Sequence, residues 1–155
     1  MTTRRALLLG TLVVGVLDIL DAFIFFSLRG AAPIRILQSI ASGVLGRSAY
    51  QGGMRTALLG LALHFIVAFC IVSVYFIATR VMPWLHRRPL LYGAFYGVLA
   101  YFGMNYVVLP LSAAAVGSGP PPTPVLINGL LIHMLGVGIP SALAARAAGG
   151  QVMNA

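Results

Sequence analysis

The chain has 155 residues, of which 60% are hydrophobic and 8% are charged, and its mean hydropathy is +1.00. A soluble domain carries about a quarter charged residues, so this composition excludes an ordinary water-soluble fold. The ten basic residues are all arginine and give a net charge of +8, but they stand mainly at the ends of apolar segments. That distribution is typical of anchors to phospholipid headgroups and argues against a nucleic-acid partner.

Four segments are apolar enough to cross a bilayer as helices, which takes roughly 20 residues each. The first is predicted at about residues 6–28, and its apolar run is longer than that of a signal peptide, so we expect an uncleaved helix. The others are predicted at about residues 57–79, 90–111 and 125–145. We therefore predict an all-α membrane protein in which residues 1–155 form a single four-helix transmembrane bundle.

The segment between the first two spans is predicted to form an amphipathic helix at about residues 33–47. On a helical wheel, one face gathers the polar or small residues Arg35, Gln38, Ser39, Ser42 and Gly46. The other face gathers the apolar residues Ile36, Leu37, Ile40, Val44 and Leu45. This pattern is typical of an interfacial helix lying along the bilayer surface. A lid packed over the end of the bundle is an equal and compatible interpretation.

Orientation follows from the arginines that flank the spans. The N-terminus, the second loop and the C-terminal tail share one side and carry six arginines, whereas the first loop carries four and the third loop none. We expect a multi-pass protein of the bacterial inner membrane with both termini in the cytoplasm. Trp84 and Tyr92, close to the second loop, fit an aromatic belt at that interface.

Both acidic residues, Asp18 and Asp21, lie within the first span. A charged side chain at the centre of a spanning helix costs on the order of 2.5–3.5 kcal/mol, so such residues are functional candidates. Counting residues from the helix ends, at roughly 1.5 Å each, places Asp21, His64, Asn105 and His133 at nearly one depth, with Asp18 one turn deeper. Each lies on a stripe of small residues, which favours the bundle interior. We therefore predict a buried polar layer made by these five residues.

The first hypothesis for this layer is a proton-binding or divalent-cation-binding site. A carboxylate and an imidazole held together in an apolar setting can share a proton or hold opposite charges. Carboxylate and imidazole groups are also the ligand types of zinc, manganese and iron, so Asp21, His64 and His133 are the candidate metal ligands. A purely structural network that fixes helix register is the alternative, above all for Asn105.

Two further classes of function stay open. A b-type haem or another tetrapyrrole would lie between His64 and His133, on helices that are diagonal in an up-and-down bundle. An accessory or structural role would make the chain a subunit of a larger membrane complex or a homo-oligomer. Enzyme motifs are missing from the sequence, which contains no glutamate, so we expect a non-enzymatic protein. Cys70, the one cysteine, is interpreted as a small buried hydrophobe.

Several stretches resemble a family of small, uncharacterised bacterial four-span membrane proteins. These stretches are residues 15–19, 34–43, 61–65, 104–112 and 128–133. The last two-thirds of the chain is also distantly similar to YagU-like inner-membrane proteins, which share a histidine-bearing helix, a helix ending in Pro-Leu and a final Gly-x-x-x-His helix. This second likeness does not include the first span. Neither family brings a known reaction, so the resemblance implies the four-span architecture and draws attention to the segment with Arg35, Gln38 and Ser39.

Overall fold

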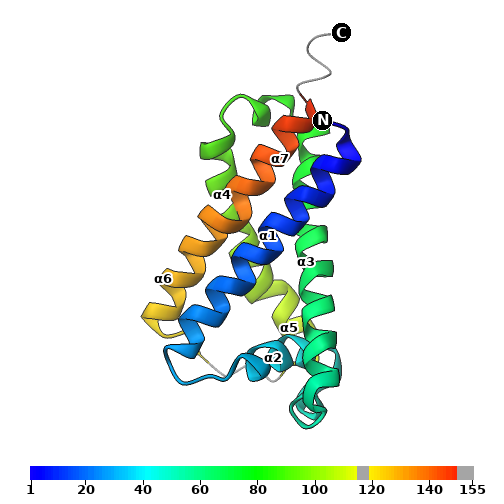
Figure 1. The fold of residues 1–155 in the computed structure, drawn as a ribbon. Coiled ribbons are helices and arrows are strands. Elements are labelled where there is room, and N and C mark those ends of the chain that lie inside the picture. Colours follow the sequence, from blue (N-terminus) through cyan, green and yellow to red (C-terminus); the bar gives the residue numbers. More distant parts are fainter. Residues whose placement is uncertain (115–118, 150–155) are drawn as a thin grey trace.

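The computed structural model describes residues 1–114 and 119–149, and this part of the chain forms an all-helical bundle (Figure 1). Four of its helices are long and apolar enough to cross a membrane: Thr3–Ser27, Gly53–Val81, Pro89–Leu111 and Thr123–Gly149. The predicted four-helix transmembrane architecture is therefore confirmed, with each predicted span inside the observed helix or within a residue of its end. The chain is a multi-pass membrane protein.

The first two spans are uninterrupted helices that pack against each other. Helix α1 covers Thr3–Ser27. Its N-cap is Thr2, whose side chain accepts a hydrogen bond from the backbone N–H of Arg5. Helix α3 covers Gly53–Val81 and contacts α1 along much of its length. Neither span alternates strongly between polar and apolar faces, because both faces are in apolar surroundings: one meets lipid and the other meets the bundle core.

The third and fourth spans are each interrupted by a π-helical segment. Helix α4 (Pro89–Gly103) continues through the π segment Met104–Val108 into the short α5 (Leu109–Leu111). Helix α6 (Thr123–Ile132) continues through the π segment His133–Gly138 into α7 (Ile139–Gly149).

A proline follows each π segment, and the local sequence explains the interruption. Pro110 and Pro140 have no N–H to continue the helical ladder. The residue before each proline donates its N–H to a methionine carbonyl five residues back: Leu109 to Met104, and Ile139 to Met134. Such π turns re-satisfy backbone groups that proline would leave unpaired in hydrocarbon.

Small residues set how closely the spans pack. A Cβ added at Gly93 would lie 2.8 Å from the Cα of Ile139, and one added at Gly97 would lie 2.6 Å from the Cα of Met134. The α4 backbone therefore lies directly against the π segment and the start of α7. At the end of the bundle that holds the termini, α7 also packs on α1 and α3, and side chains such as Val14, Val72 and Tyr75 are buried there.

Helix α2 (Pro33–Leu45), followed by a 3-10 turn at Gly46–Gln51, lies across the other end of the bundle (Figure 1). Its predicted bounds are confirmed within a few residues. It packs on the start of α3, where Gly60 meets the backbone carbonyl of Leu37. Helix α2 is thus a cover over the bundle end, the second of the two interpretations.

The face of α2 that gathers polar and small residues is the one that packs on α3. Gln38 and Ser42 of this face are buried, whereas Val44 of the apolar face is 62% exposed. The reason is that the buried side of α2 meets the polar first turn of α3 rather than hydrocarbon. Gln38 donates to the carbonyl oxygen of Gly53 at 3.1 Å and to the Thr56 hydroxyl at 3.5 Å.

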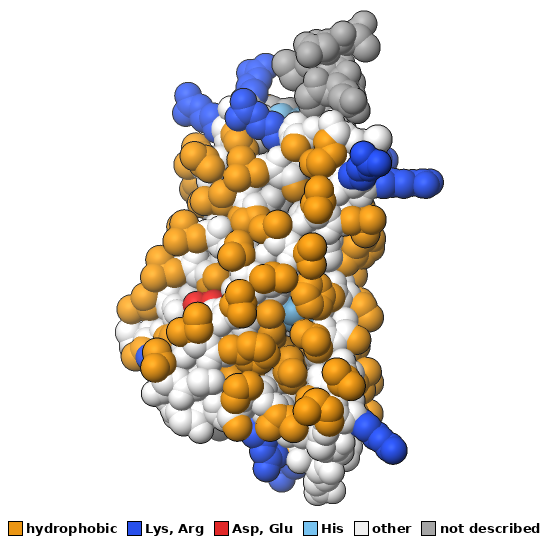
Figure 2. All heavy atoms as spheres, viewed as in Figure 1, with side chains coloured by type: hydrophobic (Ala, Val, Ile, Leu, Met, Phe, Trp, Pro, Cys, Tyr) orange, Lys and Arg blue, Asp and Glu red, His pale blue; other side chains and the backbone are white. Residues whose placement is uncertain are grey.

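The surface divides into an apolar band between two charged ends. Figure 2 shows basic side chains at both ends and hydrophobic side chains over the middle. The N-terminus and the end of α7 lie at the same end of the bundle (Figure 1), where the N-terminal amine is 3.5 Å from the carbonyl oxygen of Ala147. Trp84 and Tyr92 stack edge to face at that end, with their ring centres 4.9 Å apart. Cys70, expected to be buried, is exposed on α3, where lipid would cover it.

Candidate functional site

A cavity of about 350 Å³ opens where the spans diverge towards α2. Its wall is mainly apolar, and residues Ile36, Ser39 and Ile40 of α2 form part of its lining. The polar side chains that line it come from all four spans and from α2: Asp18, Asp21, Ser39, His64, Tyr101, Asn105, Asn128 and His133. All five residues of the predicted polar layer therefore line one cavity. They are half-buried rather than fully buried, because the cavity keeps part of each accessible.

Asp18 and His64 form the first of two polar pairs in this cavity. The Nδ1 atom of His64 lies 4.0 Å from Oδ2 of Asp18, and the side chains are 11% and 28% exposed, respectively. The Nε2 atom of His64 lies 2.8 Å from the carbonyl oxygen of Gly15. A carbonyl only accepts, so Nε2 carries a proton and donates it. Nδ1, directed towards Asp18, is then the nitrogen that can gain or lose a proton.

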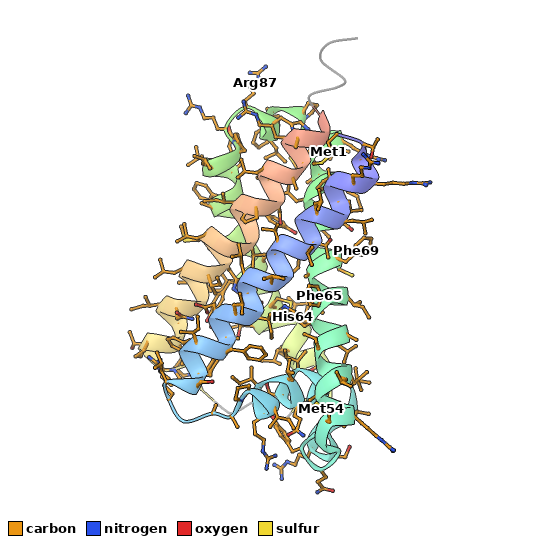
Figure 3. The ribbon with its side chains drawn as sticks, in the orientation of Figure 1. Met1, Met54, His64, Phe65, Phe69 and Arg87 are labelled. Atoms are coloured by element: carbon orange, nitrogen blue, oxygen red, sulfur yellow. The ribbon has the colours of Figure 1, made fainter. Side chains whose placement is uncertain are left out.

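The sequence around these two residues explains their approach. Gly15 has no side chain, and the position of a Cβ there is filled by the ring of Phe65. Helices α1 and α3 can therefore come close enough for His64 to reach a backbone carbonyl of α1. Figure 3 shows His64 and Phe65 between the ribbons of α1 and α3.

Asp21 and Asn128 form the second pair, between α1 and α6. The amide Nδ2 of Asn128 donates to Oδ2 of Asp21 at 2.7 Å. The predicted site omitted Asn128, which lies off the small-residue stripe of Gly129 and His133. An amide within an apolar span was the signal that could have identified it.

His133 and Tyr101 lie on the wall formed by the third and fourth spans. The Nδ1 atom of His133 is 2.9 Å from the carbonyl oxygen of Gly129, so by the same reasoning Nδ1 donates and Nε2 is the free acceptor. The Tyr101 ring packs edge to face on the imidazole, with centres 5.4 Å apart. His133 also begins the π segment of its span, and π segments are frequent at functional sites.

Asn105 lies in the other π segment. Its Nδ2 donates to the carbonyl oxygen of Tyr101 in the same span, at 2.9 Å. A bond from a side chain to the carbonyl four residues earlier is common within helices. The amide donor of Asn105 is therefore used within its own span rather than between helices.

The contacts within the layer differ from those implied by the depth count, which placed Asp21 level with His64. Asp18, rather than Asp21, meets His64, while Asp21 meets Asn128. The depth count treated the four helices as parallel, but α1 runs obliquely across α3 (Figure 1). An oblique helix shifts the level at which each of its residues meets a neighbour.

The predicted metal ligands are not assembled. Within residues 1–114 and 119–149, no three His, Cys, Asp or Glu side chains lie close enough to hold one metal ion, and this includes the set Asp21, His64 and His133. The tetrapyrrole hypothesis also lacks its geometry, since the Nε2 of His64 is engaged with Gly15.

The three residues singled out on α2 have separate roles. Arg35 donates to the carbonyl oxygen of Tyr50 at 3.2 Å, with its guanidinium 5.5 Å from the Tyr50 ring centre. Gln38 fixes α2 to α3 as described above. Only Ser39 lines the cavity, and its hydroxyl donates to the carbonyl oxygen of Ile36 at 2.7 Å.

No protein-family model, curated protein or solved structure matches this chain. The resemblance to small bacterial four-span membrane proteins therefore stays a prediction. The functional argument depends on the cavity and its polar pairs.

Proposed function

We propose that the chain is an inner-membrane protein that binds a proton within the bilayer, at the pair formed by Asp18 and His64. The 4.0 Å separation between Oδ2 and Nδ1 is the observation that supports this function. Two opposite charges at that distance attract by about 4 kcal/mol at an effective dielectric constant of about 20. Placing two charges at the centre of a span costs on the order of 5–7 kcal/mol, and this attraction offsets more than half of that cost.

The fixed orientation of the imidazole supports a proton site further. Because Nε2 donates to Gly15, only Nδ1 exchanges its proton, and it does so facing the carboxylate. With one shared proton the pair is neutral overall, either as an ion pair or as two neutral groups. Loss of that proton leaves one negative charge, and gain of a second leaves one positive charge. Asp21, His133 and Tyr101 line the same cavity and complete its set of titratable groups.

The proton version is favoured over the divalent-cation version because the described residues form no three-ligand cluster. A bacterial inner-membrane location with cytoplasmic termini is part of the proposal and is supported by the six-to-four distribution of arginines. Contact with lipid is implied by the apolar band. Further subunits or a homo-oligomer stay predictions.

The test is a pH titration of the three histidines by ¹⁵N NMR, in the purified protein in nanodiscs. Asp18→Asn removes the carboxylate that faces Nδ1 of His64, so the ¹⁵N signals of this imidazole should differ from those of the original chain across the pH range. Asp21→Asn changes the other pair and should alter the His64 signals less. His86, at the opposite end, is the internal reference. Identical His64 signals in Asp18→Asn and in the original chain would contradict the proposal.

A further inference from the structure

The second polar pair differs from the first in that its carboxylate, Asp21, faces a neutral amide instead of an imidazole. Within the described residues, Asp21 has no arginine or histidine nitrogen within 4.0 Å, and its only hydrogen bond comes from the neutral amide of Asn128. Arg29, two turns further along α1, donates instead to the carbonyl oxygen of Phe25 at 3.0 Å and lies 3.5 Å from the centre of the Phe25 ring. In the bilayer, a carboxylate in this position needs a proton or a cation.

The cavity beside Asp21 has the size and composition of a small-molecule site. Its volume of about 350 Å³ lies in the range of roughly 300–1,000 Å³ for such sites, and its wall is mainly apolar with a few convergent polar groups. The aromatic rings of Phe26 and Tyr101 are part of the lining. Aromatic rings and a carboxylate that line one cavity are groups that can recognise an organic ammonium ion.

The route of entry is lateral. Figure 2 shows acidic side-chain atoms at the surface within the hydrophobic band, and Asp18 and Asp21 are the only acidic residues of the chain. The cavity therefore communicates with the region that the lipid chains occupy. A ligand that arrives this way must be soluble in the bilayer.

We propose that the cavity binds a lipophilic organic ammonium ion, which enters from the bilayer and places its positive charge at Asp21. The amide of Asn128 holds the carboxylate in position, and the apolar wall accommodates the hydrocarbon part of the ligand. The ligand shares its cavity with the proton pair, but it depends on a different carboxylate. The proposal thus extends the proposed function and is tested separately from it.

The experiment measures equilibrium binding of radiolabelled benzyltrimethylammonium to the purified full chain in nanodiscs, at a fixed pH. Neopentylbenzene, which has a carbon atom in place of the nitrogen, is the neutral competitor of nearly the same shape. We expect saturable binding of the cation, weakened at least tenfold by Asp21→Asn and retained by Asp21→Glu. His86→Gln, at the opposite end of the bundle, should bind as the original chain does.

Three outcomes would overturn the proposal: no saturable binding to the original chain, displacement of the cation by neopentylbenzene at equal concentration, or equal affinity in Asp21→Asn. Folding of Asp21→Asn is checked independently by its helical circular dichroism and by the His64 NMR signal. Loss of cation binding in Asp21→Asn with a normal His64 titration supports the proposal. His64 signals that do not respond to Asp18→Asn would contradict only the proton site.

Discussion

Asn105 and Asn128 have the same side chain on two walls of one cavity, but their amides are used differently. Asn128 donates across to Asp21 of α1, whereas Asn105 donates to Tyr101 of its own span. A hydrogen bond between helices is lost when the partner is removed, and its loss leaves a carboxylate oxygen unpaired in an apolar setting. A hydrogen bond to the same helix adds little to an existing backbone ladder. The two positions therefore form a matched comparison.

We predict that Asn128→Leu lowers the free energy of unfolding by about 0.6–1.7 kcal/mol, the range for interhelical hydrogen bonds in membranes, and that Asn105→Leu lowers it less. The measurement is SDS-induced unfolding of the purified protein in mixed micelles. In a double-mutant cycle, Asn128→Leu should cost less when Asp21 is already Asn. Additive costs, or a larger effect at Asn105, would show that the Asp21–Asn128 hydrogen bond contributes little.

At this scale, much of the site could be predicted because ionisable residues are rare within spans. Asp18, Asp21, His64 and His133 were all expected at one site, and all of them line the cavity. Which aspartate meets His64 could not be predicted, because that depends on the angle between α1 and α3. Asn128 was missed because a single amide in an apolar span resembles many that have no role.

Among the elements, the third and fourth spans are joined by contacts between backbones. Gly97 of α4 lies against His133 and Met134, at the start of the π segment in the fourth span. Gly103, six residues further along, has open space around it, and a Cβ added there would meet nothing within 4 Å. The packing of α4 therefore depends on Gly97 and not on Gly103, although both are glycines of one helix.

We predict that Gly97→Ala destabilises the bundle by about 1–3 kcal/mol, the usual cost of overpacking, because the added methyl would collide with backbone atoms. Gly103→Ala should be neutral or stabilising, since alanine is the better helix former. Thermal unfolding of both variants in the same detergent, followed by circular dichroism, gives the comparison. Equal melting temperatures would contradict the close approach of α4 to the fourth span.

The bounds of the spans could be predicted from hydropathy, but the π segments could not. The two π segments share a sequence spacing: a methionine stands six residues before a proline, as Met104 before Pro110 and Met134 before Pro140. This common spacing is recognised only once the structure shows that both segments contain the same π turn. What covers each face of α2 could not be predicted, because a hydrophobic pattern indicates an amphipathic helix without indicating its neighbours. Here the polar first turn of α3 covers Gln38.

For the whole molecule, the arginines and the aromatic pair define two membrane interfaces. Arginines that are distant in the sequence gather at the end that holds the N-terminus and the end of α7, and the first loop with α2 is at the other end (Figures 1 and 2). Four spans require the segments before the first and after the last to share a side. From the positive-inside rule we predict that this side is the cytoplasmic one, by six arginines to four.

We predict that, in a Cys70→Ser background, a cysteine introduced at Ser48 reacts with a membrane-impermeant maleimide in intact bacterial cells, and that one introduced at Thr3 reacts only after lysis. Both positions are exposed, so access to the reagent depends on the side of the membrane rather than on burial. Labelling is measured by the mass shift of the purified protein. The reverse pattern would place the termini outside.

The divergence of the spans towards α2 gives the molecule a tapered outline (Figure 1). A tapered protein takes up more area in one leaflet of the bilayer than in the other. The lateral pressure of the lipids therefore does work on the protein whenever the cross-section of its wide end changes. Lipids that crowd that leaflet favour a narrower cavity, and lipids that relieve the crowding favour a wider one. If occupation of the proposed proton and ammonium sites changes the width of the cavity, the composition of the surrounding bilayer will act on that occupation.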